Sequence, residues 1–465
     1  MSAMSNCNLA VQELALWAAT ASPQGFNAQT VDRLKQSVRD AVGCSLYCSG
    51  LQWSRIIVEA MLDETAGAGT VAVWGTSYRL SPAAAALVNG SFVQGFELDD
   101  FHLTANMHGS STMLPAGVAL ASHRGGISGT ELIAALAVGW EVGTRISVAG
   151  IRGNALVRGW HTPTINGTFA AAAVAGRLLR LDPMRMYQCL SLAALHAGGL
   201  IAVQYGGMAK RLYAGRASQA GLYAALLANR GFTAPPDVFE RRPGGFFPTF
   251  LPDGYDINAL TRDLGGAHAA DGISFKLYAA CSAIHPALDA MKRLLVEHQI
   301  TAIDIQGITV ALGEFAYHHV GWPYRVESVT TAQFSIAYGL AVMIISGEAS
   351  VEQYTEAMIR DPCVLALVAR IRVVEDPAVS ASDSAFRNAA RLSVELVNGA
   401  VYEGGAQIAR GNADNPATDE ELATKFHILA GHALPVFQVD ALAKVIDRLE
   451  QLPDVREFET LMTPL

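Results

Sequence analysis

The sequence predicts a mainly α-helical protein with a large all-helical domain and a smaller α+β domain. Apolar residues recur at three-and-four spacing through residues 1–265, the pattern of helices with a buried face. Beyond about residue 266 the pattern changes, because residues 300–312 alternate as a strand does and Asn398-Gly399 is a strong hairpin signal. We therefore expect a helical domain over 1–265, an α+β domain over 266–410, and a tail over 411–465 that packs back on the helical domain.

The helices expected in the first domain follow one another with short breaks. They cover residues 7–20, 29–49, 54–65, 81–96, 114–123, 128–147, 163–180, 183–198 and 216–230. Several begin with a capping signal, such as Ser81-Pro82 or Asp182-Pro183. Few charged residues lie even on their polar faces, so we expect helices that pack on several sides.

The second domain is expected to alternate between helices and strands. Helical patterns cover 284–298, 332–346 and 351–359, between the strand at 300–312 and the hairpin "NAARLSVELVNGAVYEGG". The tail returns to helix with "TDEELATKFHILAGHAL" and "VDALAKVIDRLEQL".

The composition argues against nucleic-acid-binding, membrane and secreted proteins. Of 465 residues, 51% are hydrophobic and only 16% charged, with a net charge of −9, which argues against a nucleic-acid or anionic-membrane surface. Six cysteines without a CxxC pair are typical of reduced thiols in a cytosolic protein. The longest apolar run, "SIAYGLAVMIISG", is shorter than the roughly twenty residues of a membrane span. The N-terminus lacks the basic start of a signal peptide. We expect a cytoplasmic protein with no membrane or nucleic-acid partner.

One stretch, "GFELDDFHLTANMHG" at 95–109, concentrates charge in this charge-poor chain. It places Glu97, Asp99 and Asp100 beside His102 and His108, between two apolar helices. The carboxylates could be ordinary partners of a helix N-terminus. A metal site is the weaker alternative, because no HxxxH or HxxE spacing supports it, and we predict no metal.

Other segments supply imidazoles and cations. His161 precedes Thr162-Pro163, a helix opening, where exposed N–H groups lower the pKa of an imidazole and favour its neutral form. The alternative is a solvent-facing loop histidine. Gly206-Gly207 followed by Lys210 and Arg211 forms either an anion site or a glycine-rich turn with solvated cations.

Two further segments complete the candidate set. Lys276 and His285 lie in an apolar stretch, and a buried ammonium is costly without an anion. His318 and His319 lie at the end of the expected strand, where either could also be a capping or surface residue. A single site containing these groups would hold several cations and neutral imidazoles, so its ligand is expected to be a small polycarboxylate.

Five motifs in order identify a family resemblance. The segments "NGSFVQGFELDD", "GWHTPTINGT", "GGMAKRLYAGRAS", "ERRPGGFF" and "FKLYAACSAIH" resemble the MmgE/PrpD family along nearly the whole chain. The family includes 2-methylcitrate dehydratase, cis-aconitate decarboxylase and iminodisuccinate epimerase. The resemblance implies a helical domain and an α+β lid with the site between them, usually in a homodimer, and no metal or organic cofactor.

The resemblance also implies roles for particular residues. The family's acidic-loop positions fall on Glu97, Asp99 and Asp100, and its loop histidine falls on His108. The helix-start histidine falls on His161, the two site lysines on Lys210 and Lys276, and a lid residue on either His318 or His319. The loop departs from the family's Asp-Phe-Asp-Asp-Thr and has Gly109 in place of proline. The pattern Glu-Leu-Asp-Asp-aromatic-His is most similar to cis-aconitate decarboxylases, but "YHHVGWP" departs from their Cys-Gly-Trp run.

The three reactions of the family all build negative charge on a carbon next to a carboxylate. We expect Lys210 and Lys276, with Arg211 beside them, to hold substrate carboxylates, and His108, oriented by Asp99 or Asp100, to transfer the proton. The loop carboxylates Glu97, Asp99 and Asp100 are expected to position and tune the imidazoles. Glu97, Asp100 and the lid histidine, His318 or His319, are expected to line the substrate site. His161 is expected to be a second ligand contact or acid–base group. The favoured reaction is decarboxylation of cis-aconitate or a close analogue. The alternatives are dehydration of 2-methylcitrate-like acids, epimerisation of an iminodisuccinate-like compound, and a binding protein without catalysis.

Overall fold

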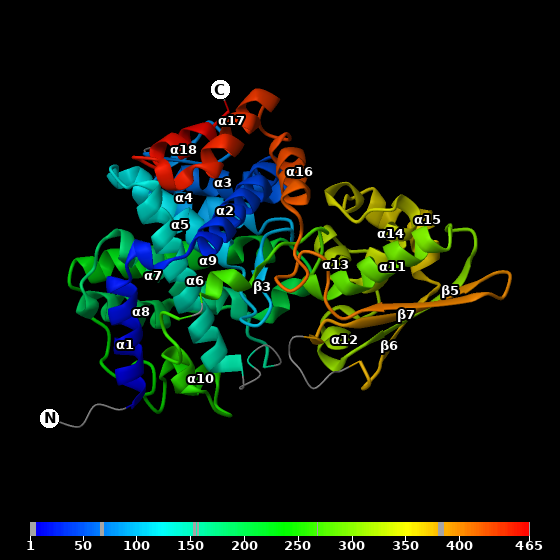
Figure 1. Cartoon of the computed structure of the whole chain (residues 1–465), viewed down its shortest axis with the longest axis horizontal. Helices are drawn as coiled ribbons and strands as arrows, with labels where there is room; N and C mark the ends of the chain where they lie inside the picture. The colour runs from blue at the N-terminus through cyan, green and yellow to red at the C-terminus, as the bar shows by residue number, and fades with distance from the viewer. Residues whose placement is uncertain are drawn as a thin grey trace.

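The fold has a large helical part and a smaller α+β part, as predicted (Figure 1). The structure, a computed structural model, describes residues 6–65, 69–151, 155, 158–266, 268–379 and 386–464. In Figure 1 the helical part carries the first and the last helix of the chain, and the sheet with its helices extends from its side.

All nine helices expected in the first part are present. They are α1 (Asn6–Thr20), α2 (Ala28–Ser49), α3 (Gln52–Thr65), α4 (Pro82–Val93), α5 (Gly109–Arg124), α6 (Gly129–Ile151), α7 (Thr162–Leu178), α8 (Pro183–His196) and α9 (Tyr213–Asn229), followed by the short α10 (Phe246–Phe250). Two short strands, β1 (Val71–Ala72) and β2 (Arg79–Leu80), form a small hairpin between α3 and α4.

Helix α7 is the centre of this part, because α5, α6, α8 and α9 all pack against it. Its residues 170–175 are completely buried and almost all alanine. Small side chains allow close approach: a Cβ at Gly221 of α9 would lie 2.6 Å from the backbone nitrogen of Ala172. The low charge of these helices thus follows from packing on several sides, as expected.

Helix α5 begins at Gly109 rather than at 114. Gly109 packs against the ring of Trp140 in α6, and a Cβ there would lie 2.4 Å from that ring. The glycine that replaces the family's proline is therefore required by this contact. It also makes His108 the residue that precedes the first turn of the helix.

The α+β part contains one mixed sheet in the order β6-β5-β7-β8. The strands are β5 (Ile305–Leu312), β6 (Ile371–Glu375), β7 (Ala390–Leu396) and β8 (Val401–Ala406), and only the β5–β6 pair is parallel. Helix α11 (His285–Glu297) contacts β7 and β8, and α14 (Ile336–Ser346) contacts β6, so these helices cover one face. The predicted hairpin turn is confirmed, with Gly399 at φ +85°.

Four details of this part differ from the prediction. The strand begins at Ile305 instead of 300, because the side chain of Asp304 accepts hydrogen bonds from Thr301 and closes a turn. The helix expected at 332–346 is divided, since Ser335 caps α14 after the short α13 (Val329–Gln333). Residues 351–359 form two 3-10 turns, Val351–Gln353 and Met358–Arg360, rather than an α-helix. Helix α15 (Pro362–Val368) and strand β6 were not predicted.

The chain then returns to the helical part. Helices α16 (Asp419–Ala430) and α17 (Val436–Asp447) pack on α2, and α18 (Arg456–Leu461) packs on α5. Helix α16 lies at the junction of the two parts (Figure 1). One helix segment, Gly129–Gly150, is long and apolar enough to cross a membrane, but 89% of its apolar window is buried, as in a core helix of a globular protein.

Candidate active site

The acidic loop between α4 and α5 lies where the two parts of the protein meet. Its short strand β3 (Phe101–His102) pairs antiparallel with β4 (Ile273–Ser274), which directly precedes the segment of Lys276. Glu97 adopts a left-handed backbone conformation, with φ +56°, that is uncommon for a side chain of this size. These features bring Glu97 and Lys276 together from segments far apart in the sequence.

Glu97 is a buried carboxylate surrounded by three cations. The Nζ of Lys210 donates to its Oε1 at 2.5 Å, and Nη1 of Arg211 lies 3.7 Å from the same oxygen. The Nζ of Lys276 lies 3.6 Å from Oε2 and also donates to the Glu97 carbonyl at 3.1 Å. Burial alone would raise the pKa of Glu97, but the charges of Lys210, Lys276 and Arg211 lower it well below its usual range. Glu97 is therefore an ion-pair partner of the cations, not of an imidazole as expected.

Residues of both parts of the protein hold Lys210 and Arg211 in place. Gly206 and Gly207, with φ of +149° and +69°, form the turn before the 3-10 turn that carries Lys210 and Arg211. Arg211 donates to Thr330 Oγ1 at 2.9 Å and Gln333 Oε1 at 2.7 Å, both in α13. Its guanidinium also lies 5.0 Å from the centre of the Trp53 ring. The Nζ of Lys210 lies 5.2 Å from the centre of the Phe334 ring.

His108 is paired with a carboxylate from the same loop. Its Nδ1 lies 3.1 Å from Asp99 Oδ2 and 3.1 Å from the Asp100 carbonyl oxygen. Asp99 is fully buried, and its Oδ1 has no hydrogen-bond partner among the described residues. This geometry orients the ring.

The side chain of Asp100 is turned away from His108. It accepts hydrogen bonds from Ser37 and from the backbone and side chain of Ser110, in the first turn of α5. Burial and the nearby carboxylate of Asp40 raise the pKa of Asp100 to about 8. The sequence left open which aspartate orients the imidazole, and the geometry assigns that contact to Asp99. Asp100 holds the start of α5, and the substrate contact expected of it remains a prediction.

His161 is the residue that precedes α7. It is 4% exposed, and its Nδ1 lies 2.5 Å from Thr164 Oγ1, while its backbone N–H donates to Gly199. Burial, followed by the positive charges of Lys210 and His108, lowers its pKa well below the usual range. The ring is therefore neutral at neutral pH. The expected direction is right, but burial is the main cause.

His318 and His319 lie on a helix rather than at the end of a strand. Strand β5 ends at Leu312, and α12 (Glu314–Val320) begins after Gly313. His318 is exposed and its ring packs on Tyr317. The His319 ring contacts Phe334 edge-on at 5.8 Å between centres, and burial, then Lys210 and Arg387, lower its pKa to about 4. Of the two, His319 faces the cations and His318 does not.

The sequence did not indicate Lys425, which joins the two loops of the site. This buried residue of α16 donates through Nζ to the carbonyl oxygens of Leu98 at 2.6 Å and Lys276 at 2.9 Å. Its third partner is the buried carboxylate of Asp40 in α2. The contacts are between backbone carbonyls and a side chain more than a hundred residues away, and neither sequence pattern nor spacing carries that information.

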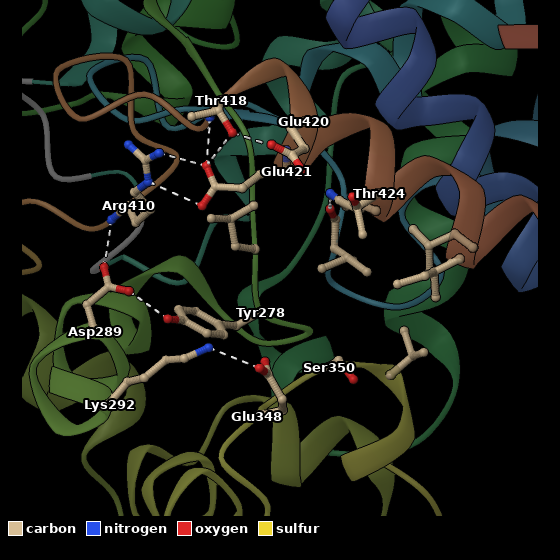
Figure 2. A pocket seen from close by; sticks show the side chains of 16 residues that line it. Tyr278, Asp289, Lys292, Glu348, Ser350, Arg410, Thr418, Glu420, Glu421 and Thr424 are labelled. Atoms are coloured by element: carbon tan, nitrogen blue, oxygen red, sulfur yellow. Dashed lines mark hydrogen bonds and ion pairs between the residues drawn. The ribbon is translucent and has the colours of Figure 1, made fainter. Parts of the chain in front are cut away.

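A cavity of about 730 Å³ lies beside this contact, between α16 and α11 (Figure 2). Lys425 and Leu98 line it, but Lys210, Lys276 and the site histidines are not among its lining residues. Its charged groups are mostly paired with one another: Lys292 with Glu348 at 3.0 Å and Arg410 with Glu421 at 2.7 Å (Figure 2). We therefore place the candidate active site at the Glu97 cluster and not in this cavity.

The predicted site residues lie close enough for their charges to act on one another. The charges of Lys210 and His108 act on both Glu97 and His161, and those of Lys210 and Lys276 act on His319. The Nε2 of His285 lies 3.2 Å from the Ala280 carbonyl oxygen, and burial, followed by the charge of Lys276, lowers its pKa to about 3. In the part of the chain that the structure describes, no three His, Cys, Asp or Glu side chains are arranged to hold a metal ion.

Comparison with known proteins assigns this architecture to a family. Residues 12–258 match the MmgE/PrpD N-terminal domain, and residues 278–451 match the MmgE/PrpD C-terminal domain. The chain belongs to the MmgE/PrpD family. The family resemblance found in the sequence is thus confirmed.

Relatives within the family cover almost the whole chain. The chain is 32% identical to a cis-aconitate decarboxylase-like protein, oryM, of Aspergillus oryzae, over 97% of this chain and 96% of that protein. It is 30% identical to a cis-aconitate decarboxylase of Aspergillus terreus, over 99% and 97%. A 2-methylcitrate dehydratase of Escherichia coli is 23% identical over 90% of each chain. Decarboxylases and dehydratases of this kind are lyases, and the present MmgE/PrpD chain is an enzyme of that class.

Proposed function

We propose that this enzyme decarboxylates cis-aconitate, or a close unsaturated tricarboxylate, without a metal or organic cofactor. One observation carries the proposal: the buried cations Lys210, Arg211 and Lys276 converge on Glu97, beside His108 and His161. The three cations outnumber the carboxylates of Glu97 and Asp99, so the site retains positive charge for an anionic ligand. Similarity to cis-aconitate decarboxylases along nearly the whole chain favours this reaction over dehydration.

The cations would bind the carboxylates that the substrate keeps. When the carbon–carbon bond to the third carboxylate breaks, CO2 leaves and the electron pair remains as an allylic carbanion conjugated with a retained carboxylate. Buried cations stabilise this developing charge without reorganising, a contribution of about 3 to 4 kcal/mol for a well-placed donor. Lys210 and Lys276 take this role, since both are fixed by Glu97 before the substrate enters.

His108 would supply the proton that completes the reaction. Its contact with Asp99 orients the ring, which in its imidazolium form would give its proton to the far carbon of the allylic carbanion and regain one from water. Overall, cis-aconitate and one proton give itaconate and CO2. His161 and His319 are neutral at neutral pH, because burial and the neighbouring cations lower their pKa values. They would therefore act as hydrogen-bonding groups toward the substrate.

The decisive test is incubation with cis-aconitate and, separately, 2-methylcitrate in D2O, followed by NMR. The proposal predicts CO2 release from cis-aconitate, itaconate carrying one deuterium, and no product from 2-methylcitrate. A vinylic product from 2-methylcitrate without CO2 from cis-aconitate would make the enzyme a dehydratase. Deuterium exchange without net conversion would indicate epimerisation, and conversion of neither acid would also overturn the proposal.

The homodimer and the cytoplasmic location expected from the sequence remain predictions. Sedimentation equilibrium of the purified chain tests the first. A mass of one chain over the working concentration range would contradict it.

A further inference from the structure

Arg387 is a buried cation at the boundary between the α+β part and the helical part. It lies just before β7, and its Nη2 donates to the Leu103 carbonyl at 2.7 Å and approaches Asn106 Oδ1 at 3.4 Å, both in the acidic loop. Its guanidinium covers the ring of Phe315 in α12, 4.9 Å from the ring centre. The side chain thus reaches from the α+β part into the loop that carries Glu97 and His108.

The charge of Arg387 has no carboxylate partner among the described residues. Its Nε is buried without a hydrogen-bond partner, and burial lowers its pKa to about 10. Other buried arginines differ: Arg145 pairs with Glu141 at 2.6 Å, and Arg211 lies 3.7 Å from Glu97. A buried cation without an anion is destabilising. An anionic ligand would therefore satisfy both the charge and the unused Nε–H.

One series of contacts connects Arg387 to the site lysine. Its partner Phe315 contacts the His319 ring at 5.5 Å between centres, and His319 contacts Phe334, over which Lys210 lies. The charge of Arg387 also acts on His319.

A second series leads to the other histidine. Asn106, which Arg387 approaches, donates to Thr162 Oγ1 at 2.6 Å, and Thr162 directly follows His161. Arg387 is therefore linked through Phe315 to His319, and through Asn106 and Thr162 to the residue that follows His161. A ligand that reaches from Lys210 past these imidazoles would meet the guanidinium.

We propose that Arg387 binds a substrate carboxylate at the far end of the site from Lys210 and Lys276, and so selects tricarboxylates over dicarboxylates. The inference rests on the proposed function, because it assigns the polycarboxylate its third anchor. A guanidinium suits this role, since its planar N–H groups match a carboxylate and it stays charged when buried. In this arrangement the lysines bind any polycarboxylate, and Arg387 adds affinity only where a further carboxylate is present.

The test compares binding of two non-reacting acids by calorimetry, the tricarboxylate tricarballylate and the dicarboxylate glutarate. Arg387→Met is expected to weaken tricarballylate binding by about 10- to 100-fold and to leave glutarate binding nearly unchanged. Arg387→Lys should fall between the variant and the wild type. Arg293→Met is the matched control, because this exposed arginine of α11 also donates to a backbone carbonyl, that of Gly405.

The outcomes separate this inference from the proposed function. If Arg387→Met binds tricarballylate as the wild type does, or loses both acids equally, Arg387 is only a tether between the two parts and the inference is wrong. A raised KM for cis-aconitate with a smaller change in kcat would support it independently. If the wild type binds neither acid and converts no polycarboxylate, the proposed function itself fails, and the inference fails with it.

Discussion

Replacing His108 with alanine should abolish most of the activity while the protein stays folded. The ring contacts Asp99 and the Asp100 carbonyl, makes no side-chain cap for α5, and is 16% exposed. Losing one hydrogen bond to a charged group costs about 1.5 to 3 kcal/mol of folding stability. Losing a general acid costs about 10²- to 10⁴-fold in rate, which corresponds to about 3 to 5 kcal/mol of transition-state free energy.

The assay is CO2 release from cis-aconitate, with circular dichroism and thermal melting on the same samples. His318→Ala is the control, since that histidine is exposed and packs on Tyr317 away from the cations. His108→Ala with near-normal kcat would refute the role of the ring. So would an equal loss in the His318→Ala control.

Asp99 should act only through His108. Asp99→Asn keeps the shape of the side chain but removes the carboxylate that orients the His108 ring, so kcat should fall by about 10- to 100-fold. The double variant should then be no slower than His108→Ala alone, because groups that act as a unit are not additive. Additive losses would mean that Asp99 has a separate role.

Three further predictions concern stability and charge. Lys425→Met leaves a buried carboxylate and two carbonyls unpaired and should lower the free energy of unfolding by about 3 to 5 kcal/mol in a denaturant titration, whereas exposed Lys444→Met should not. Asp100, with a folded pKa of about 8, binds its proton more tightly in the folded protein than in the unfolded chain. Its contribution to stability is therefore lost as pH rises from about 4 to about 8, by up to about 1.4 kcal/mol per pH unit, and Asp100→Asn should show a smaller loss over pH 5–8. Glu97→Gln removes the counter-ion of three buried cations, so the melting temperature of the variant should be lower than that of the wild type. Tricarballylate should then raise the melting temperature of the variant more than that of the wild type. An equal or smaller rise would contradict the assignment of these cations to a carboxylate ligand.

The helical order and the site residues with local signals were predictable. The helix-start position of His161 and the glycine turn before Lys210 are features of neighbouring residues, and α7 and the turn at Gly206 form where expected. The hairpin at Asn398-Gly399 was predictable for the same reason, since turn chemistry is local.

Long-range contacts were not predictable. The sequence placed Glu97 with the imidazoles, but its left-handed backbone and the β3–β4 pairing direct it to Lys210 and Lys276 instead. The choice between His318 and His319 depends on which face of α12 meets Phe334, and the sequence indicated no helix there. Arg387 has no local signal at all, because its contacts lie in a loop nearly three hundred residues earlier.

The late position of Lys425 in the sequence has a consequence for the growing chain during synthesis. The two loops that Lys425 connects leave the ribosome early, but the helix that supplies it follows the entire α+β part. During synthesis, the nascent chain therefore carries every proposed catalytic group before those groups have their final spacing. A truncation between β8 and α16 should yield a protein that contains the complete set of reactive side chains and yet cannot catalyse the reaction.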